Sequence, residues 1–260
     1  MVEKLKVKSA SFSYDGKINI FEKVSFSIES GDVLCILGPN GAGKSTLIMC
    51  MGHILNLTEG RVWLYGRDMA GLNHRQIAQK IGYIPQRHNP VFPYSVLDVV
   101  LMGRAAHLGR LSSPGRKDRD IAQKAIERVG IPHLIKKPYT EISGGEMQLV
   151  LIAMVLAQEP SILLLDEPTS HLDFGNQVRI LNVITGLAEE GLSIIMSSHF
   201  PDHAFVTANK AAIMKQGESM LMGEPDVVIT EETMRTTYGV DVKILSLDSD
   251  SHRKVCIPLH

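Results

Sequence analysis

The sequence is poor in cysteine and has no excess of charge of either sign. Its three cysteines, Cys35, Cys50 and Cys256, form no Cys-x-x-Cys pair and cannot all be joined in disulfides. That usage favours reduced thiols in a cytoplasmic protein. The 27 Lys and Arg residues nearly balance the 28 Asp and Glu residues. Because nucleic acid attracts strongly basic surfaces, this balance argues against nucleic acid as the main partner.

Long apolar runs are also lacking. The longest uninterrupted one, Leu149 to Ala157, covers nine positions, whereas a membrane-spanning helix needs about 20. The first residues alternate charged with apolar side chains and contain no hydrophobic stretch typical of a signal peptide. We therefore expect a cytoplasmic chain whose contact with any membrane is peripheral.

The order of apolar patterns predicts a single α/β domain over residues 1–260, with a polar C-terminal tail from about 243 to 260 at the surface. Alternating apolar residues between 5 and 28 predict short strands joined by turns. The continuous apolar run Val33–Leu37 predicts a strand covered on both faces. A mainly helical pattern, about 88–157, predicts an inserted helical subdomain, and the return of strands and helices after Ile162 predicts a largely parallel sheet.

A glycine-rich segment after the first buried strand fits the pattern G-x-x-x-x-G-K-[ST]. Its glycines allow backbone N–H groups to close around phosphate oxygens at the start of a helix. Lys44 is expected on the β and γ phosphates, Ser45 on Mg²⁺, and Thr46 to add a hydroxyl nearby. The residues predicted to bind the triphosphate of a nucleotide are Gly38, Pro39, Asn40, Gly41, Ala42, Gly43, Lys44, Ser45 and Thr46. The alternative is a glycine-rich turn that binds no ligand. It does not explain why the segment lies between a buried strand and a helix, which is the context that phosphate binding requires.

Two adjacent carboxylates, Asp166 and Glu167, follow the apolar strand Ile162–Leu165. Ligands of α/β folds bind at the carboxyl edge of the sheet, where these side chains are expected. We expect Asp166 to hold Mg²⁺ through water and Glu167 to polarise the attacking water. Acidic residues also favour the first turn of a helix, so the pair alone leaves both interpretations open. Together with the phosphate loop it favours a hydrolytic site.

A third motif, Ser143-Gly144-Gly145, precedes the strongly apolar helical run. It offers a hydroxyl and exposed backbone N–H groups at a helix start. The alternative is an ordinary N-cap, in which Ser143 only caps the helix. The segment by itself does not decide between the two.

Taken together, the motifs resemble the ATP-binding subunits of ABC transporters over about residues 5–238. They occur in the order Tyr14, phosphate loop, Gln86, Ser143, Asp166-Glu167, Ser170-His171-Leu172-Asp173 and His199. The resemblance implies a P-loop NTPase core with a largely parallel sheet, an N-terminal antiparallel β subdomain and an inserted helical subdomain. It implies an ATP hydrolase that uses ATP and Mg²⁺.

Individual roles follow from the same resemblance. It implies that Tyr14 stacks on adenine, that Gln86 senses Mg²⁺ and the γ-phosphate as a metal ligand, and that His199 contacts the γ-phosphate opposite Glu167. The catalytic set is then Glu167, His199, Gln86 and Lys44. Each of the three residues also has a structural interpretation without a ligand. Tyr14 could be an aromatic residue of a strand, Gln86 a polar loop residue and His199 a histidine at the end of a strand.

The resemblance further implies that the hydrolytic site forms in a head-to-tail homodimer. Ser143, Gly144 and Gly145 would reach the ATP held by the second copy, where an arginine finger acts in other enzymes, and Asp173 would lie at the seam. The chain departs from the family pattern at four positions: Ile142 for Leu, Glu146 for Gln, and Met147 and Met154 where arginine is frequent. We expect the fold and the ATP site to survive these changes and the turnover rate to be the property they affect.

Three kinds of ABC protein compete: an importer ATPase with a separate permease, a soluble ATPase acting in translation or DNA repair, and an ATP-binding switch. The soluble class predicts tandem cassettes or a long coiled-coil insertion, yet the chain between Gln86 and Ser143 has room only for a helical subdomain. A pure switch would lose its base, and Glu167 is present. The importer ATPase is therefore favoured.

Within the importers, segments 92–104 and 170–177 resemble ATPases for iron–siderophore, haem and cobalamin uptake, so a metal chelate is the expected cargo. Uptake of molybdate- or tungstate-type oxyanions is the alternative. The expected partners are integral membrane permease subunits and, indirectly, an external substrate-binding protein. The expected location is the cytoplasmic face of the membrane.

Overall fold

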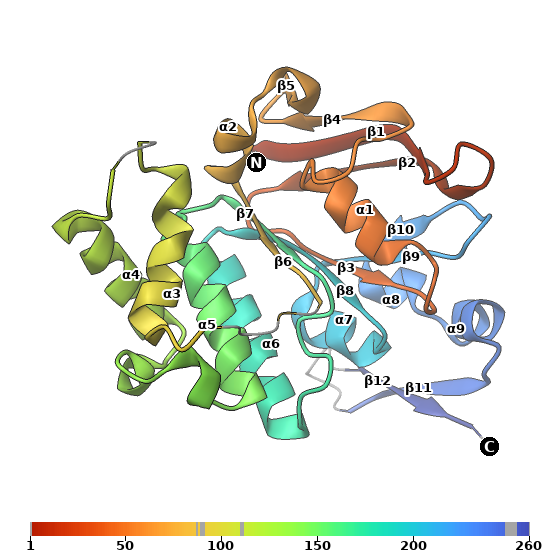
Figure 1. Ribbon diagram of the computed structural model, residues 1–260. Helices are drawn as coiled ribbons and strands as arrows, with labels where there is room; N and C mark the ends of the chain where they lie inside the picture. The colour runs from red at the N-terminus through yellow and green to blue at the C-terminus, as the bar shows by residue number, and fades with distance from the viewer. Residues whose placement is uncertain (1, 87, 89–91, 110–111, 248–253, 260) are drawn as a thin grey trace.

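The computed structural model describes residues 2–86, 88, 92–109, 112–247 and 254–259. Two sheets dominate it (Figure 1). One is antiparallel, with strand order β2-β1-β4-β5. Its strands are β1 (Glu3–Ser13), β2 (Asn19–Glu29), β4 (Glu59–Leu64) and β5 (Arg67–Asp68). This sheet confirms the predicted N-terminal antiparallel subdomain.

The second sheet has strand order β10-β9-β3-β8-β7-β6, and all its pairs are parallel except β10 with β9. Its strands are β3 (Val33–Leu37), β6 (Ile81–Ile84), β7 (Ile162–Leu165), β8 (Ser193–Ser198), β9 (Lys210–Ile213) and β10 (Leu221–Gly223). The largely parallel sheet is thereby confirmed. It places the carboxyl ends of β3, β6, β7 and β8 at one edge.

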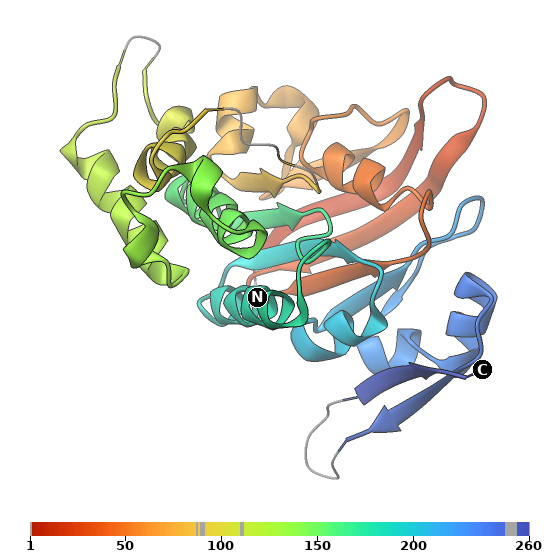
Figure 2. The same ribbon diagram turned by 60° about the horizontal axis from the view of Figure 1, so that its bottom comes forward.

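Helices cover both faces of the parallel sheet (Figures 1 and 2). They are α1 (Lys44–Met51), α2 (His74–Ala78), α3 (Val96–Met102), α4 (Arg116–Arg128), α5 (Gly144–Ala157), α6 (Phe174–Glu189), α7 (Pro201–Thr207), α8 (Pro225–Val228) and α9 (Glu231–Tyr238). Short 3₁₀ turns lie at Met69–Gly71, Gly103–Ala106, Pro132–Leu134 and Tyr139–Glu141. No helix in the described residues is long and apolar enough to cross a membrane.

Strand β3 shows how the core is divided. Leu34 and Ile36 pack with α1 and the antiparallel sheet, whereas Cys35 and Leu37 pack with the cluster that contains α5 and α6. Successive side chains of a strand point to opposite faces, so a strand covered on both sides is apolar throughout. The run Val33–Leu37 has this composition, and all five residues are buried.

Helices α3, α4 and α5 lie together at one end of the sheet, within the segment where the sequence predicts a helical subdomain (Figure 1). Arg104 joins them: its guanidinium is buried and lies 2.9 Å from Asp118 Oδ1 on α4 and 2.7 Å from the carbonyl oxygen of Ala157 at the end of α5. Such hydrogen bonds satisfy a charge that burial would otherwise destabilise. The group of helices is thus fixed by packing and by this arginine.

The predicted C-terminal tail contains regular structure. Strands β11 (Val242–Ser246) and β12 (Lys254–Pro258) form an antiparallel pair beside α7 (Figure 2). Val242, Ile244 and Cys256 pack against the core, and the backbone N–H of Cys256 donates to Asp202 Oδ1 at 2.7 Å. The segment predicted as a polar surface tail therefore contains two strands, whose alternating apolar residues cover the surface beside α7. Most of the polar run that suggested the tail lies outside the described residues.

Candidate active site

The phosphate loop runs from the end of β3 to the start of α1. Gly43, with φ 95°, has a left-handed backbone, and a Cβ there would lie 2.6 Å from Ile20 Cγ2. Lys44 points back into the loop, where its Nζ donates to the carbonyl oxygens of Gly38 at 2.7 Å and Pro39 at 3.0 Å. Burial lowers the pKa of the Lys44 ammonium, and the charges of Glu167 and Asp166 oppose that shift. The loop thus holds one cation inside a ring of backbone groups.

Asp166 follows β7 and lies behind the loop. Its Oδ1 accepts hydrogen bonds from Ser45 Oγ at 3.0 Å and from Ser197 Oγ at 2.7 Å. Ser45 and Asp166 therefore present two adjacent oxygens, the ligand type that Mg²⁺ prefers. Among the described residues, no cluster of three or more His, Cys, Asp or Glu side chains could hold a metal ion. The Ser45 and Asp166 oxygens suit Mg²⁺, which takes one or two protein ligands and completes its shell with phosphate and water.

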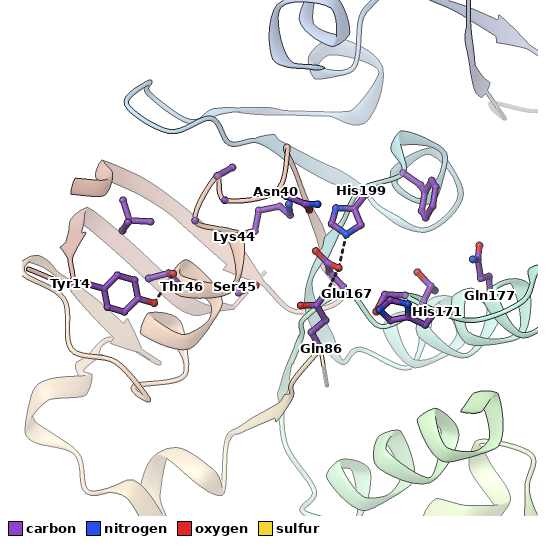
Figure 3. Close-up of a pocket in the computed structure, with 17 residues that line it drawn as sticks. Tyr14, Asn40, Lys44, Ser45, Thr46, Gln86, Glu167, His171, Gln177 and His199 are labelled. Atoms are coloured by element: carbon purple, nitrogen blue, oxygen red, sulfur yellow. Dashed lines mark hydrogen bonds and ion pairs between the residues drawn. The ribbon is translucent and has the colours of Figure 1, made fainter. Parts of the chain in front are cut away.

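Residues that follow three neighbouring strands meet at the Glu167 carboxylate. Its Oε2 accepts from Gln86 Nε2 at 2.6 Å and lies 2.6 Å from His199 Nε2 (Figure 3). Gln86 follows β6, Glu167 follows β7 and His199 follows β8, and the β6–β7 and β7–β8 registers are parallel. The Glu167 carboxylate faces the phosphate loop with two polar neighbours that fix its direction.

Tyr14 lies at the mouth of the site, after β1. Its hydroxyl is 3.1 Å from Thr46 Oγ1, and its ring meets the ring of Phe12 edge-on at 4.8 Å between centroids. The side chain is 63% exposed. An exposed aromatic held at its hydroxyl and at one edge leaves a face free for stacking. Thr46, predicted to add a hydroxyl near the phosphates, contacts Tyr14.

A cavity of about 780 Å³ lies between these groups. It is lined by Tyr14, Ile20, Asn40, Gly41, Ala42, Gly43, Lys44, Ser45, Thr46, Gln86, Glu167, Thr169, Ser170, His171, Gln177, His199 and Phe200. Gly38, Pro39 and Asp166 do not line it: they lie behind, bonded to Lys44 and Ser45. The volume is within the range of small-molecule sites.

Several lining residues were not predicted as site residues. Thr169, Ser170 and His171 follow Glu167 closely, so their proximity to the carboxylate was a signal in the sequence. Gln177 comes from the first turn of α6. Ile20 and Phe200 are apolar and carry no chemical signal; only the fold brings them to the cavity.

The Ser143-Gly144-Gly145 motif and Asp173 lie outside the cavity lining. Ser143 caps α5: its Oγ accepts from the N–H of Glu146 at 3.3 Å, and Glu146 Oε2 accepts from the N–H of Ser143 at 2.8 Å. Asp173 caps α6 by accepting from the N–H of Asn176 at 2.8 Å. Within one chain both residues therefore act as N-caps. Glu146, one of the departures from the family pattern, completes a capping box.

The Met147 and Met154 departures also have a local explanation. Both side chains are partly buried and pack against the hydrophobic cluster beneath α5. A methionine fills such a space without the polar contacts that an arginine needs. The substitution therefore extends the apolar surface of α5 within the helical subdomain.

The parallel sheet, the phosphate loop and the paired carboxylates define a nucleotide-hydrolysing protein. A family model described as ABC transporter matches residues 21–170. The chain belongs to the ABC transporter family, as an ATP-binding subunit that hydrolyses ATP.

Relatives of the chain support the same family. It is 36% identical to the hemin import ATP-binding protein HmuV of Gloeobacter violaceus, over 87% of this chain and 84% of that protein. It is 34% identical to the molybdate import ATP-binding protein MolC of Haemophilus influenzae, over 92% of this chain and 89% of that protein. A solved structure described as a metal-chelate type ABC transporter in an inward-facing conformation matches with a TM-score of 0.88 and 31% identity, over 99% of this chain and 98% of that one.

Proposed function

We propose that this chain is the ATPase of an importer that moves a metal chelate of the iron–siderophore, haem or cobalamin class through a separate membrane permease. The observation that carries the hydrolytic part is the Glu167 carboxylate, held 2.6 Å from both Gln86 Nε2 and His199 Nε2 and facing the phosphate loop. The metal-chelate part is supported by the hemin importer and by the metal-chelate transporter structure.

The phosphate loop binds the triphosphate. Backbone N–H groups and the Lys44 ammonium stabilise the phosphate charge, and the exposed face of Tyr14 stacks on adenine. Ser45, Asp166 and Gln86 are the residues that would hold Mg²⁺, and the ion would supply positive charge to the phosphate oxygens. Lys44, Ser45, Asp166 and Gln86 lie at one edge of the parallel sheet, and Tyr14 lines the same cavity from the end of β1.

Glu167 acts as the general base. Its carboxylate takes a proton from the attacking water, while Gln86 and the His199 imidazole fix the direction of the carboxylate and contact the γ-phosphate. Preorganised donors of this kind stabilise a transition state because they need no reorientation during the reaction. The catalytic residues of the proposal are Glu167, His199, Gln86 and Lys44.

The site is completed by a second copy in a head-to-tail homodimer. Ser143, Gly144 and Gly145 of one copy contact the ATP of the other, and Asp173 lies at the seam. Support comes from their position: they lie at the starts of α5 and α6 and do not line the cavity of their own chain. ATP binding joins the two copies and hydrolysis releases them, which moves permease subunits docked near residues 86–104. The complex would lie at the cytoplasmic face of the membrane and receive cargo from an external binding protein.

The variant Glu167→Gln tests the hydrolytic mechanism. It keeps the size of the side chain and removes the base, so we expect ATP binding and an ATP-dependent dimer to persist while turnover falls about 10²–10⁴-fold. Phosphate release measures turnover, and sedimentation in Mg²⁺-ATP measures the ATP-dependent dimer. Normal turnover in this variant would refute the role of Glu167.

Purification from native membranes tests the transport class. A tagged chain solubilised in detergent with Mg²⁺-ATP should retain a polytopic membrane protein in stoichiometric amount, identified by mass spectrometry. Recovery only of ribosomal or DNA-repair proteins would favour a soluble, non-transport ATPase instead.

The relationship to MolC keeps molybdate- or tungstate-type oxyanions as a second candidate cargo. Uptake assays in proteoliposomes that contain the recovered permease and its binding protein distinguish the two candidate cargoes. Uptake of haem, a ferric siderophore or cobalamin that stops in the Glu167→Gln variant supports the metal chelate. Uptake of molybdate in place of these cargoes would overturn that choice and leave the ATPase mechanism intact.

A further inference from the structure

The backbone of Glu167 has an uncommon conformation. Its φ is 49°, in the left-handed region, although the residue carries a Cβ. Such a conformation is unfavourable for residues other than glycine and persists where the surrounding structure fixes it. The turn directs the Glu167 carboxylate toward Gln86 and His199, so whatever fixes the turn also fixes the carboxylate.

The side chain that fixes this turn comes from the neighbouring strand. Ser197 Oγ accepts a hydrogen bond from the backbone N–H of Glu167 at 2.9 Å and donates one to Asp166 Oδ1 at 2.7 Å. The β7–β8 register pairs Leu165 with Met196, which places Ser197 level with the two acidic residues that follow β7. One hydroxyl thus holds both members of the carboxylate pair.

Burial makes these hydrogen bonds important. Ser197 is fully buried, and Asp166 and Glu167 are 4% and 7% exposed. In the described part of the chain, the Glu167 N–H donates to Ser197 Oγ and to no backbone carbonyl. A buried N–H that loses its partner destabilises the conformation that buries it. Removal of the hydroxyl would therefore favour rotation of the Glu167 peptide out of the left-handed turn.

We infer that Ser197 is a positioning residue for ATP hydrolysis: it holds the left-handed turn at Glu167 and the Asp166 carboxylate in the geometry that the reaction uses. The inference rests on the proposed role of Glu167 as the base. Ser197 does not line the cavity, and its hydroxyl bonds to the Glu167 N–H and the Asp166 carboxylate. Its loss should affect the chemical step more than the binding of nucleotide.

Strand β8 provides a matched control. Ser193 lies on the same strand four positions earlier, is also fully buried and donates from Oγ to the carbonyl oxygen of Glu29 at 2.6 Å. It lies at the opposite end of β8 from the site. Ser193→Ala and Ser197→Ala therefore each remove one buried hydroxyl from the same strand. Only Ser197→Ala removes a hydroxyl that bonds to Asp166 and Glu167.

Steady-state hydrolysis by the full-length protein distinguishes the two variants. For Ser197→Ala we expect kcat to fall on the order of 10- to 100-fold, the effect of a misplaced catalytic group, with KM and the affinity for a fluorescent ATP analogue near those of the wild type. Ser193→Ala should keep the wild-type kcat. The double variant Ser197→Ala/Glu167→Gln should lose less activity than the product of the two single losses, because residues that act as a unit are not additive.

Three outcomes would overturn the inference: a wild-type kcat for Ser197→Ala, an equal loss in Ser193→Ala, or a multiplied loss in the double variant. The failures of the two proposals are distinguishable. If Glu167→Gln hydrolyses ATP normally, the role of Glu167 is wrong and the inference about Ser197 is overturned with it. If Glu167→Gln is inactive and Ser197→Ala is fully active, only the inference about Ser197 is wrong.

Discussion

The space beside Gly145 is filled by the side chain of Asn176. A Cβ on Gly145 would lie 2.3 Å from both Cγ and Oδ1 of Asn176. Asn176 is not free to move aside, because its Nδ2 donates to Asp173 Oδ2 at 2.8 Å and its backbone N–H donates to Asp173 Oδ1 at 2.8 Å. The first turns of α5 and α6 can therefore pack closely because Gly145 has no side chain.

This contact predicts the sign of a stability change. Alanine favours a helix over glycine by about 1 kcal/mol, so propensity alone predicts that Gly145→Ala stabilises the protein. Overpacking costs about 1–3 kcal/mol, and we expect it to prevail and lower the free energy of unfolding. Urea denaturation measures the change.

The control is the same substitution in an Asn176→Ala background, where the clash is absent. There we expect Gly145→Ala to be neutral or stabilising, as a double-mutant cycle would record for two residues in contact. A stabilised Gly145→Ala single variant would show that Asn176 moves away without cost.

Motifs whose chemistry depends on local spacing were predictable from the sequence. The phosphate loop follows the buried run Val33–Leu37 directly, and Asp166 and Glu167 follow another buried strand, so parallel pairing was enough to bring them to one edge. Gln86 and His199 were placed by the family resemblance, and the structure brings both to Glu167.

Other features depend on packing between distant segments. Ser197 is an ordinary strand serine in the sequence, and only the β7–β8 register places it against Glu167. Strands β11 and β12 were missed because the polar run between them masked a weak alternation that becomes stable only on the surface beside α7.

Lys44 should contribute to nucleotide affinity. The Lys44→Ala variant removes the charge that the loop holds beside the phosphates, and it also removes the bonds to Gly38 and Pro39 that order the loop. Hydrogen bonds to charged groups contribute about 1.5–3 kcal/mol, so we expect ATP affinity to fall roughly 10- to 150-fold. Equilibrium binding of a fluorescent analogue provides the measurement, and unchanged affinity would contradict a phosphate-binding role for the loop.

Tyr14 should contribute through its ring and not through its hydroxyl. Stacking of a base on an aromatic side chain contributes about 1–3 kcal/mol by alanine substitution, so Tyr14→Ala should weaken ATP binding roughly 5- to 150-fold. Tyr14→Phe keeps the ring and loses only the bond to Thr46, so its affinity should stay near that of the wild type. Equal losses in the two variants would assign the effect to the hydroxyl instead of to stacking.

Behind His199 lies a second, buried histidine. His203 Nδ1 lies 2.9 Å from Ser198 Oγ, and Ser198 Oγ in turn accepts from the N–H of Phe200 at 3.0 Å. Burial lowers the pKa of His203 below 6.5; the charge of Asp202 opposes this shift and that of His199 adds to it. The folded protein thus keeps His203 neutral at a pH where the unfolded chain has begun to protonate it.

The shift predicts the direction of a pH dependence. Because the unfolded state binds more protons in this range, the free energy of unfolding should decrease as the pH falls from the unfolded pKa of about 6.5 toward the lower folded pKa, by at most about 1.4 kcal/mol per pH unit for one proton. Above that range His203 should contribute no slope. His203→Gln cannot titrate, so its thermal unfolding should depend less on pH in this interval than that of the wild type. A His203→Gln curve parallel to the wild-type curve would show that other groups cause the loss of stability.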